Sequence, residues 1–271
     1  MPRTEKSTRV AAILAVAAAL YGSSLACCGS QGCSGAPSQA PTATPTAPAT
    51  LTSTPTPTVT PSPTEAITAD LSYPDWPVVL SDSFDDNRNQ WFEGEYENDS
   101  VKGNISIENG KYRIDLTAEE AFTWWVTQDF PPADVIRLED FFISVEARKM
   151  EGPGDLEFGI MFRYWNTDQY VFTINADHQD YSFRVYAEGQ WTTLIDRAEC
   201  AAIVPDGSNR IAVLGKGSVF SFFINGECVH QAEDDTLKAG TAGMGLMGWT
   251  AGIRTTLEFD NFEARAPESD G

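Results

Sequence analysis

The stretch Gly154–Ile195, GDLEFGIMFRYWNTDQYVFTINADHQDYSFRVYAEGQWTTLI, decides the fold class because apolar and polar residues alternate along it. A period of two residues is typical of half-buried β-strands. The apolar register comprises Leu156, Phe158, Ile160, Phe162, Tyr170, Phe172, Ile174, Tyr181, Phe183 and Val185. The opposite register is mixed and comprises Glu157, Gly159, Met161, Arg163, Val171, Thr173, Asn175, Ser182, Arg184 and Tyr186. The stretch predicts three strands and the start of a fourth, with one face in a core and the other free for function.

The rest of the folded part repeats this pattern. Strand-like segments cover Lys111–Thr117, Phe122–Phe130, Asp140–Arg148, Arg210–His230 and Thr255–Ala264. Turn signals such as Asn109-Gly110 and Asn225-Gly226 separate them and favour tight hairpins. No segment has a sustained helical period, so we expect an all-β fold of two stacked antiparallel sheets.

The charge of the chain bears on its partners. The 271 residues hold 18 Lys and Arg against 39 Asp and Glu, a formal net charge of -21. Such a surface repels a phosphate backbone. We therefore expect no nucleic-acid partner.

The N-terminal residues 1–27 have the pattern of an export signal. A basic start precedes the apolar run Val10–Gly22, which is shorter than the roughly 20 residues that a membrane-spanning helix needs. The following Leu25-Ala26-Cys27-Cys28 resembles the lipobox of bacterial lipoproteins, which implies lipidation of Cys28, with Cys27 as the alternative acceptor. We expect a secreted protein held at the cell surface, with membrane contact only through this lipid. Ordinary secretion with cleavage nearby and a retained membrane helix are the alternatives.

Residues 28–70 are rich in Pro, Thr, Ala and Ser and contain few side chains that could build a core. This composition predicts an extended, disordered stalk. The folded domain is expected over residues 71–267.

Several short motifs occur along the predicted domain: Phe84-Asp85-Asp86 with Trp91, DFFISVEAR (140–148), FGIMFR (158–163), FSFFING (220–226), GMGL (243–246) and FDNF (259–262). Together they resemble the concanavalin A-like lectin/glucanase superfamily, in particular its 3-keto-disaccharide hydrolase-like and laminin-G-like jelly rolls. The resemblance implies a jelly-roll sandwich. Its members include sugar-binding modules, glycan-cleaving enzymes and domains without a sugar ligand, so fold alone leaves these three functions open.

The resemblance also supplies a catalytic candidate. Glu258, Asp260 and Glu263 fit the E-x-D-x-x-E pattern of laminarinase-type glucanases, which implies nucleophile, orienting and acid/base roles. Few residues follow Glu263, however, so the segment also fits a final strand that pairs with the first. A non-catalytic module is our first hypothesis, and a hydrolase or lyase acting on glycosides is the alternative.

Calcium is the one ion that the sequence favours, and no other cofactor is expected. Asp82, Asp85 and Asp86 near the first strand would lie beside Asp260 if the first and last strands pair. A solvated acidic edge without a metal is the alternative.

The predicted ligand is an extracellular glycan, because outward aromatic rings stack on sugars and planar polar groups bind hydroxyls. In Phe122–Phe130 the alternation directs Trp124 inward and Trp125 outward. The candidate ligand-binding residues are Trp125, Glu146, Arg163, Asn175, Arg184 and Tyr186. Cross-strand ion pairs on a solvated sheet are the alternative role of the charged ones.

Two cysteines lie in the predicted domain. Cys200 and Cys228 would be exported, where disulfides persist, and a bridge would close a loop of about 27 residues and contribute roughly 3 kcal/mol. Two unpaired thiols are the alternative.

Overall fold

The computed structural model describes residues 75–128 and 136–268, which form fifteen strands and no helix. The predicted export signal, Cys28 and the stalk lie outside these residues. Within the same part of the chain, no helix is long and apolar enough to cross a membrane.

The strands form two antiparallel sheets. The nine-stranded sheet contains β1 (Val78–Asp82), β2 (Gly94–Glu97), β3 (Val101–Glu108), β4 (Lys111–Ala118), β6 (Phe141–Glu151), β11 (Asn209–Lys216), β12 (Val219–Ile224), β13 (Glu227–Glu233) and β15 (Ile253–Arg265). The six-stranded sheet contains β5 (Phe122–Val126), β7 (Glu157–Trp165), β8 (Asp168–Asn175), β9 (Asp180–Ala187), β10 (Gln190–Glu199) and β14 (Thr241–Gly248). The all-β, two-sheet prediction is confirmed.

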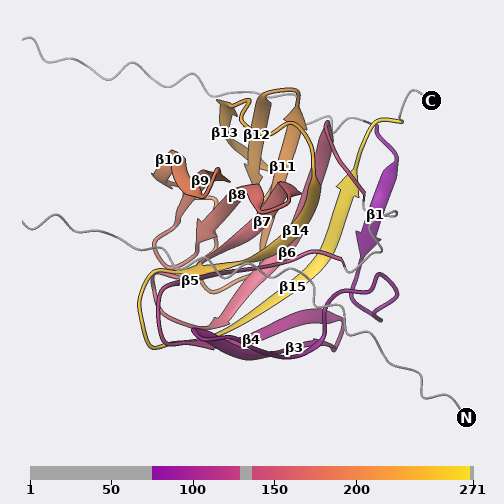
Figure 1. Ribbon diagram of the computed structural model, residues 1–271. Coiled ribbons are helices and arrows are strands. Elements are labelled where there is room, and N and C mark those ends of the chain that lie inside the picture. The colour runs from indigo at the N-terminus through magenta and orange to yellow at the C-terminus, as the bar shows by residue number, and fades with distance from the viewer. Residues whose placement is uncertain (1–74, 129–135, 269–271) are drawn as a thin grey trace, which may run out of the picture. The chain divides into compact units, whose positions relative to one another are not determined.

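Among the described strands, seven pairs are hairpins of consecutive strands, and six pairs join strands that are distant in the sequence. The six-stranded sheet runs β10-β9-β8-β7-β14-β5, and the nine-stranded sheet runs β13-β12-β11-β6-β15-β4-β3-β2. The first described strand, β1, pairs antiparallel with the last, β15, as Figure 1 shows at the edge where the indigo and yellow strands run together. The Asn109-Gly110 and Asn225-Gly226 turns adopt positive φ at both residues, as tight hairpin turns require.

One core lies between the sheets. The apolar register of β7, β8 and β9 is buried in it together with the inward residues of β4, β6 and β12. Rings from opposite sheets meet there: the centroids of Phe172 and Phe222 are 4.5 Å apart, and those of Phe162 and Phe220 are 5.3 Å apart. Burying aromatic side chains of this size is the main stabilisation that such a sandwich has. The core therefore fixes which side of the six-stranded sheet faces outward.

Candidate functional site: the outer face of the six-stranded sheet

The outer face of the six-stranded sheet, hereafter the outer face, carries a second apolar cluster of its own. Its buried members are Trp125, Met161, Val171 and Met247, and partly buried Tyr164, Trp191 and Trp249 pack against them. Trp124, one residue before Trp125, lies in the main core instead. Alternation along β5 thus separates the two tryptophans as expected.

A row of small side chains crosses this face. Trp125 pairs with Gly245, Gly245 with Gly159, Gly159 with Thr173, and Thr173 with Ser182. The Trp125 ring lies over Gly245, because a Cβ added at that glycine would be 2.7 Å from Trp125 Cε3. A side chain at position 245 would also clash with the Trp124 carbonyl oxygen, so a glycine is needed there.

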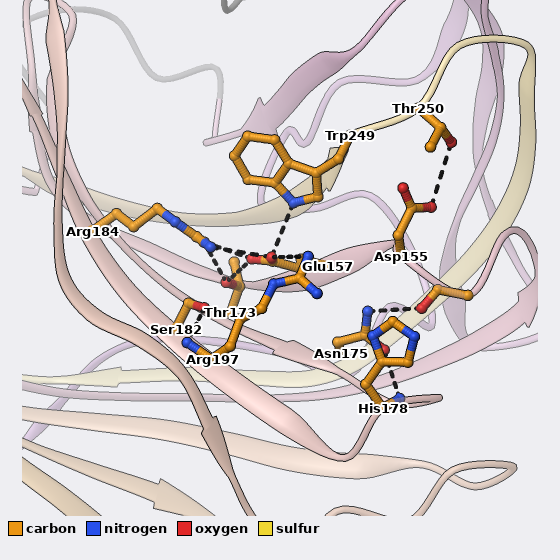
Figure 2. Close-up of polar contacts among 11 residues, drawn as sticks. Asp155, Glu157, Thr173, Asn175, His178, Ser182, Arg184, Arg197, Trp249 and Thr250 are labelled. Carbon is orange, nitrogen blue, oxygen red and sulfur yellow. Dashed lines mark hydrogen bonds and ion pairs between the residues drawn. The ribbon is translucent and has the colours of Figure 1, made fainter. Parts of the chain in front are cut away.

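A buried carboxylate, Glu157 at the start of β7, lies at the centre of the polar half of the outer face (Figure 2). Arg184 on β9 donates from Nη1 to Oε2 at 2.6 Å and from Nη2 to Oε1 at 3.1 Å. Thr173 Oγ1 donates to Oε2 at 2.7 Å, and Trp249 Nε1 donates to Oε1 at 2.9 Å. Each carboxylate oxygen thus accepts two hydrogen bonds, so the charge of Glu157 is fully compensated.

Trp249 also covers the cation of this pair. The Arg184 guanidinium carbon is 5.1 Å from the Trp249 ring centroid, within the range of a cation–π contact. Glu157 is 1% exposed and Arg184 5% exposed, whereas Trp249 is only partly buried. The ion pair therefore holds a partly exposed indole in a fixed orientation above the sheet.

Two further charged residues surround this centre. Arg197 on β10 approaches Glu157 Oε1 to 4.0 Å. Burial raises the pKa of Asp180 on β9; the charge of Glu157 adds to this rise, and Arg197, His178 and Arg184 oppose it. The four charges Glu157, Asp180, Arg184 and Arg197 balance one another.

Comparison with known proteins identifies the architecture. No protein-family model matches the sequence, and no curated protein matches it. Among solved structures, a Bacillus licheniformis β-glucanase is similar with a TM-score of 0.52 at 13% identity, covering 70% of this chain and 98% of that one. A Bacillus subtilis protein of unknown function with a galectin-like fold is similar with a TM-score of 0.50 at 12% identity, covering 69% and 95%. The described domain is a jelly-roll sandwich. At these identities the likeness shows the fold alone, and the predicted 3-keto-disaccharide hydrolase-like family stays a prediction.

The jelly roll brings four of the six predicted ligand-binding residues to the outer face: Trp125, Asn175, Arg184 and Tyr186. The Tyr186 ring centroid is 5.1 Å from that of Trp191. Asn175 donates to the Gly154 carbonyl at 2.8 Å, and its side-chain oxygen accepts the backbone N–H of His178 at 2.9 Å. Asn175 therefore holds the turn between β8 and β9. Trp125 is only 7% exposed, so most of its ring is covered by neighbouring residues.

Arg163 is not on the outer face, which corrects the prediction. The pairing of β7 with β8 shifts between Phe162 and Trp165, and Arg163 has a φ of 49°. This bulge redirects the guanidinium, which donates to the carbonyls of Leu237, Glu139 and Gly217 at 2.7, 2.9 and 2.5 Å. Arg163 is a buried link between loops, because a bulge breaks the two-residue alternation.

Glu146 lies on β6 of the other sheet, which is a second correction. In the strand register it lies opposite Arg210 on β11 and opposite Asp260 on β15. Glu146 lines an open cavity of about 600 Å³ together with Ser81, Asp82, Ser83, Asp85, Asp86, Arg88, Asn89, Arg210, Asn261, Phe262 and Glu263. Strand alternation gives the face of a residue but not the sheet to which its strand belongs.

The carboxylates of the E-x-D-x-x-E pattern lie on β15 of the nine-stranded sheet, and each is paired with a cation. Arg113 Nη1 is 3.1 Å from Glu258, Lys111 contacts Asp260, and Arg265 Nε is 2.8 Å from Glu263. The pairing of β15 with β6 also shifts between Asp260 and Glu263. The three carboxylates therefore lie away from the outer face, and none of them is free of a cationic partner.

The predicted calcium ligands Asp82, Asp85 and Asp86 lie at or just after the end of β1, and Asp260 lies on β15. Other protein groups already bind these carboxylates. Asp82 accepts the Phe84 backbone N–H and the Trp91 indole N–H at 2.7 and 2.8 Å. Asp86 pairs with Arg88, whose hydrogen bonds lower the pKa of Asp86 to about 2. Within residues 75–128 and 136–268 no group of three or more His, Cys, Asp or Glu is placed to hold a metal ion.

The predicted disulfide is absent from the described domain, where Cys200 and Cys228 are both free thiols. Cys200 is buried in the main core, whereas Cys228 packs with Phe223 in a separate cluster. The pairing of β12 with β13 shifts between Phe222 and Phe223, which sets the side that Cys228 faces.

Sequence reasoning placed Glu157 in the outward register but did not select it, and it missed Trp191, Arg197 and Trp249 as site residues. The sequence did contain a signal for Glu157. Among the outward residues of β7, β8 and β9, only Glu157 and Asp180 are acidic. No sequence signal places Trp249, which follows the end of β14.

Proposed function

We propose that the jelly-roll domain binds an extracellular carbohydrate on its outer face without cleaving it. The observation that carries this proposal is the partly exposed indole of Trp249, fixed by its hydrogen bond to Glu157 and by the guanidinium of Arg184. A sugar ring stacks on an aromatic face, and its hydroxyls bind planar polar groups beside it. Partly buried Trp191, which packs against the buried ring of Tyr186, supplies further aromatic surface on the same side.

The rigidity of this arrangement favours binding. Glu157 receives four hydrogen bonds, so Trp249 and Arg184 are held before any ligand arrives. A pre-organised site avoids the entropy cost of ordering side chains when the ligand binds. The buried pair is therefore a support for a recognition surface.

The same contacts argue against catalysis at this place. A retaining glycosidase needs two carboxyl groups about 5 Å apart, one of which is a free nucleophile. Glu157 is held by a bidentate guanidinium, and the carboxylates of the E-x-D-x-x-E pattern are paired on the other sheet. The similarity to a β-glucanase supports a glycan partner in general, and we assign to this chain the binding role alone.

The proposed setting is the cell surface. The N-terminal signal, lipidation at Cys28 and the Pro- and Thr-rich stalk would hold the domain outside the cell at a distance from the membrane.

A glycan array probed with the full chain tests the function, and reducing-sugar release over the same polysaccharides tests cleavage. Binding without release is the expected result. Release of sugar would favour the glycosidase alternative. An array without signal, for protein that is folded by circular dichroism, would favour a structural or protein-interaction role.

A further inference from the structure

Three strands of the described domain contain a bulge at which a residue other than glycine has positive φ: Arg163 at 49°, Arg197 at 42° and Asn261 at 50°. Such backbone positions are sparsely populated and persist where the surrounding structure enforces them. The Arg163 bulge has a structural explanation, because its guanidinium joins three backbone carbonyls. The Arg197 bulge has none of this kind.

The backbone of Arg197 is fixed, whereas its side chain has only electrostatic contacts, with Glu157 and Asp180. Its backbone N–H donates to Ser182 Oγ at 3.3 Å, which ties the bulge in β10 to the outer face. Its guanidinium makes no hydrogen bond to any described residue and comes only within 4.0 Å of Glu157. The side chain is 43% exposed beside the buried pair (Figure 2).

Glu157 does not need this second arginine. Both of its oxygens already accept two hydrogen bonds, and Arg184 neutralises its charge. Up to five N–H donors of Arg197 thus remain available at the edge of the proposed binding surface.

We propose that Arg197 is a ligand-contacting residue that selects neutral sugars by donating to two adjacent hydroxyls through its planar guanidinium. This inference rests on the proposed function. We infer a neutral sugar from the charges around Arg197. Glu157 and Asp180 are acidic and Arg184 is basic, so together with Arg197 the site has no net charge. A ligand carboxylate would meet both acids and a chain of net charge -21.

The test compares four variants of the full chain with the wild type by isothermal titration: Arg197→Ala, Arg197→Lys, Arg254→Ala and Trp249→Ala. The neutral polysaccharides are laminarin, barley β-glucan, arabinoxylan and levan, and the carboxylated ones are pectate and alginate. Arg197→Ala removes the guanidinium, and Arg197→Lys keeps the charge but loses the planar pair of donors. Arg254→Ala is the matched control, because Arg254 is an exposed arginine on β15 of the other sheet.

Arg197→Ala is expected to weaken binding of the neutral polysaccharide by about tenfold to a hundredfold, the range for hydrogen bonds from a charged donor. Arg197→Lys should recover little of this loss, Arg254→Ala should bind as the wild type does, and all thermal midpoints should agree. Wild-type affinity in Arg197→Ala, with binding lost in Trp249→Ala, would overturn the role of Arg197 and leave the proposed function standing. Full recovery by Arg197→Lys, or a loss confined to pectate or alginate, would overturn the hydroxyl-pair assignment. A wild-type chain that binds none of the six would overturn both proposals.

Discussion

Replacing Arg184 by alanine removes the cation from a buried ion pair and should strongly destabilise the domain. Glu157, at 1% exposure, would keep the hydrogen bonds from Thr173 and Trp249 but would lose its bidentate cation, and the remaining cation, Arg197, is 4.0 Å away without a hydrogen bond. Breaking a buried pair in this way costs about 3–5 kcal/mol. Strand alternation alone predicts the opposite, because an outward residue on a solvated sheet contributes little to stability.

Urea unfolding followed by circular dichroism measures this loss. For a domain of this size it corresponds to a fall in the thermal midpoint of roughly 6–20 °C. Glu157→Ala combined with Arg184→Ala should cost less than the sum of the two single changes, with a coupling energy of at least about 1 kcal/mol. Arg254→Ala is the control and should change stability by less than about 0.5 kcal/mol. An Arg184→Ala variant as stable as this control would refute the view that the pair is buried and structural.

Three further results are expected. In denatured, non-reduced protein, both Cys200 and Cys228 should be alkylated. In the native protein both should react slowly at neutral pH, because burial raises the pKa of each thiol. A protein mass lower by two hydrogens, without alkylation of either cysteine, would show a disulfide and contradict this prediction. Asp180→Asn should stabilise the domain at pH 7, because burial raises the folded-state pKa of this carboxyl and its ionisation therefore opposes folding. The gain in stability should vanish as the pH falls below about 4, the ordinary pKa of Asp. An equal gain at pH 7 and below pH 4 would contradict the raised pKa. Metabolic labelling with a fatty-acid analogue should mark the wild type and not Cys28→Ala, whereas retained label would move the acceptor to Cys27.

Most of the fold was predictable because the two-residue period is a local property of the chain. Leu156, Phe158, Ile160 and Phe162 are all buried in the main core, as their alternation requires. The Asn-Gly pairs fixed two hairpins for an equally local reason, since they favour positive φ. The pairing of β1 with β15 is long-range, and it was predicted only conditionally, from the resemblance to other jelly rolls.

The errors at the site arise from effects that alternation does not carry. One inserted residue in β7 turns Arg163 inward, and a shift between β12 and β13 sets the side of Cys228. Glu146 was placed on the wrong sheet because neighbouring strands in the sequence, β5 and β6, belong to different sheets. The burial of Glu157 and Arg184 depends on Trp249, which comes from a segment about 65 residues beyond Arg184.

The most direct test of the central claim is the dissociation constant of the bound glycan for three tryptophan-to-alanine variants of the full chain, measured by isothermal titration. Trp191 and Trp249 are partly buried on the outer face, and Trp76 is a partly buried tryptophan near Lys216 of the other sheet. Loss of one stacking ring should weaken binding by about tenfold or more in Trp191→Ala and Trp249→Ala, while Trp76→Ala should bind as the wild type does. Equal affinity in all three variants, or a loss confined to Trp76→Ala, would contradict a carbohydrate site on the outer face.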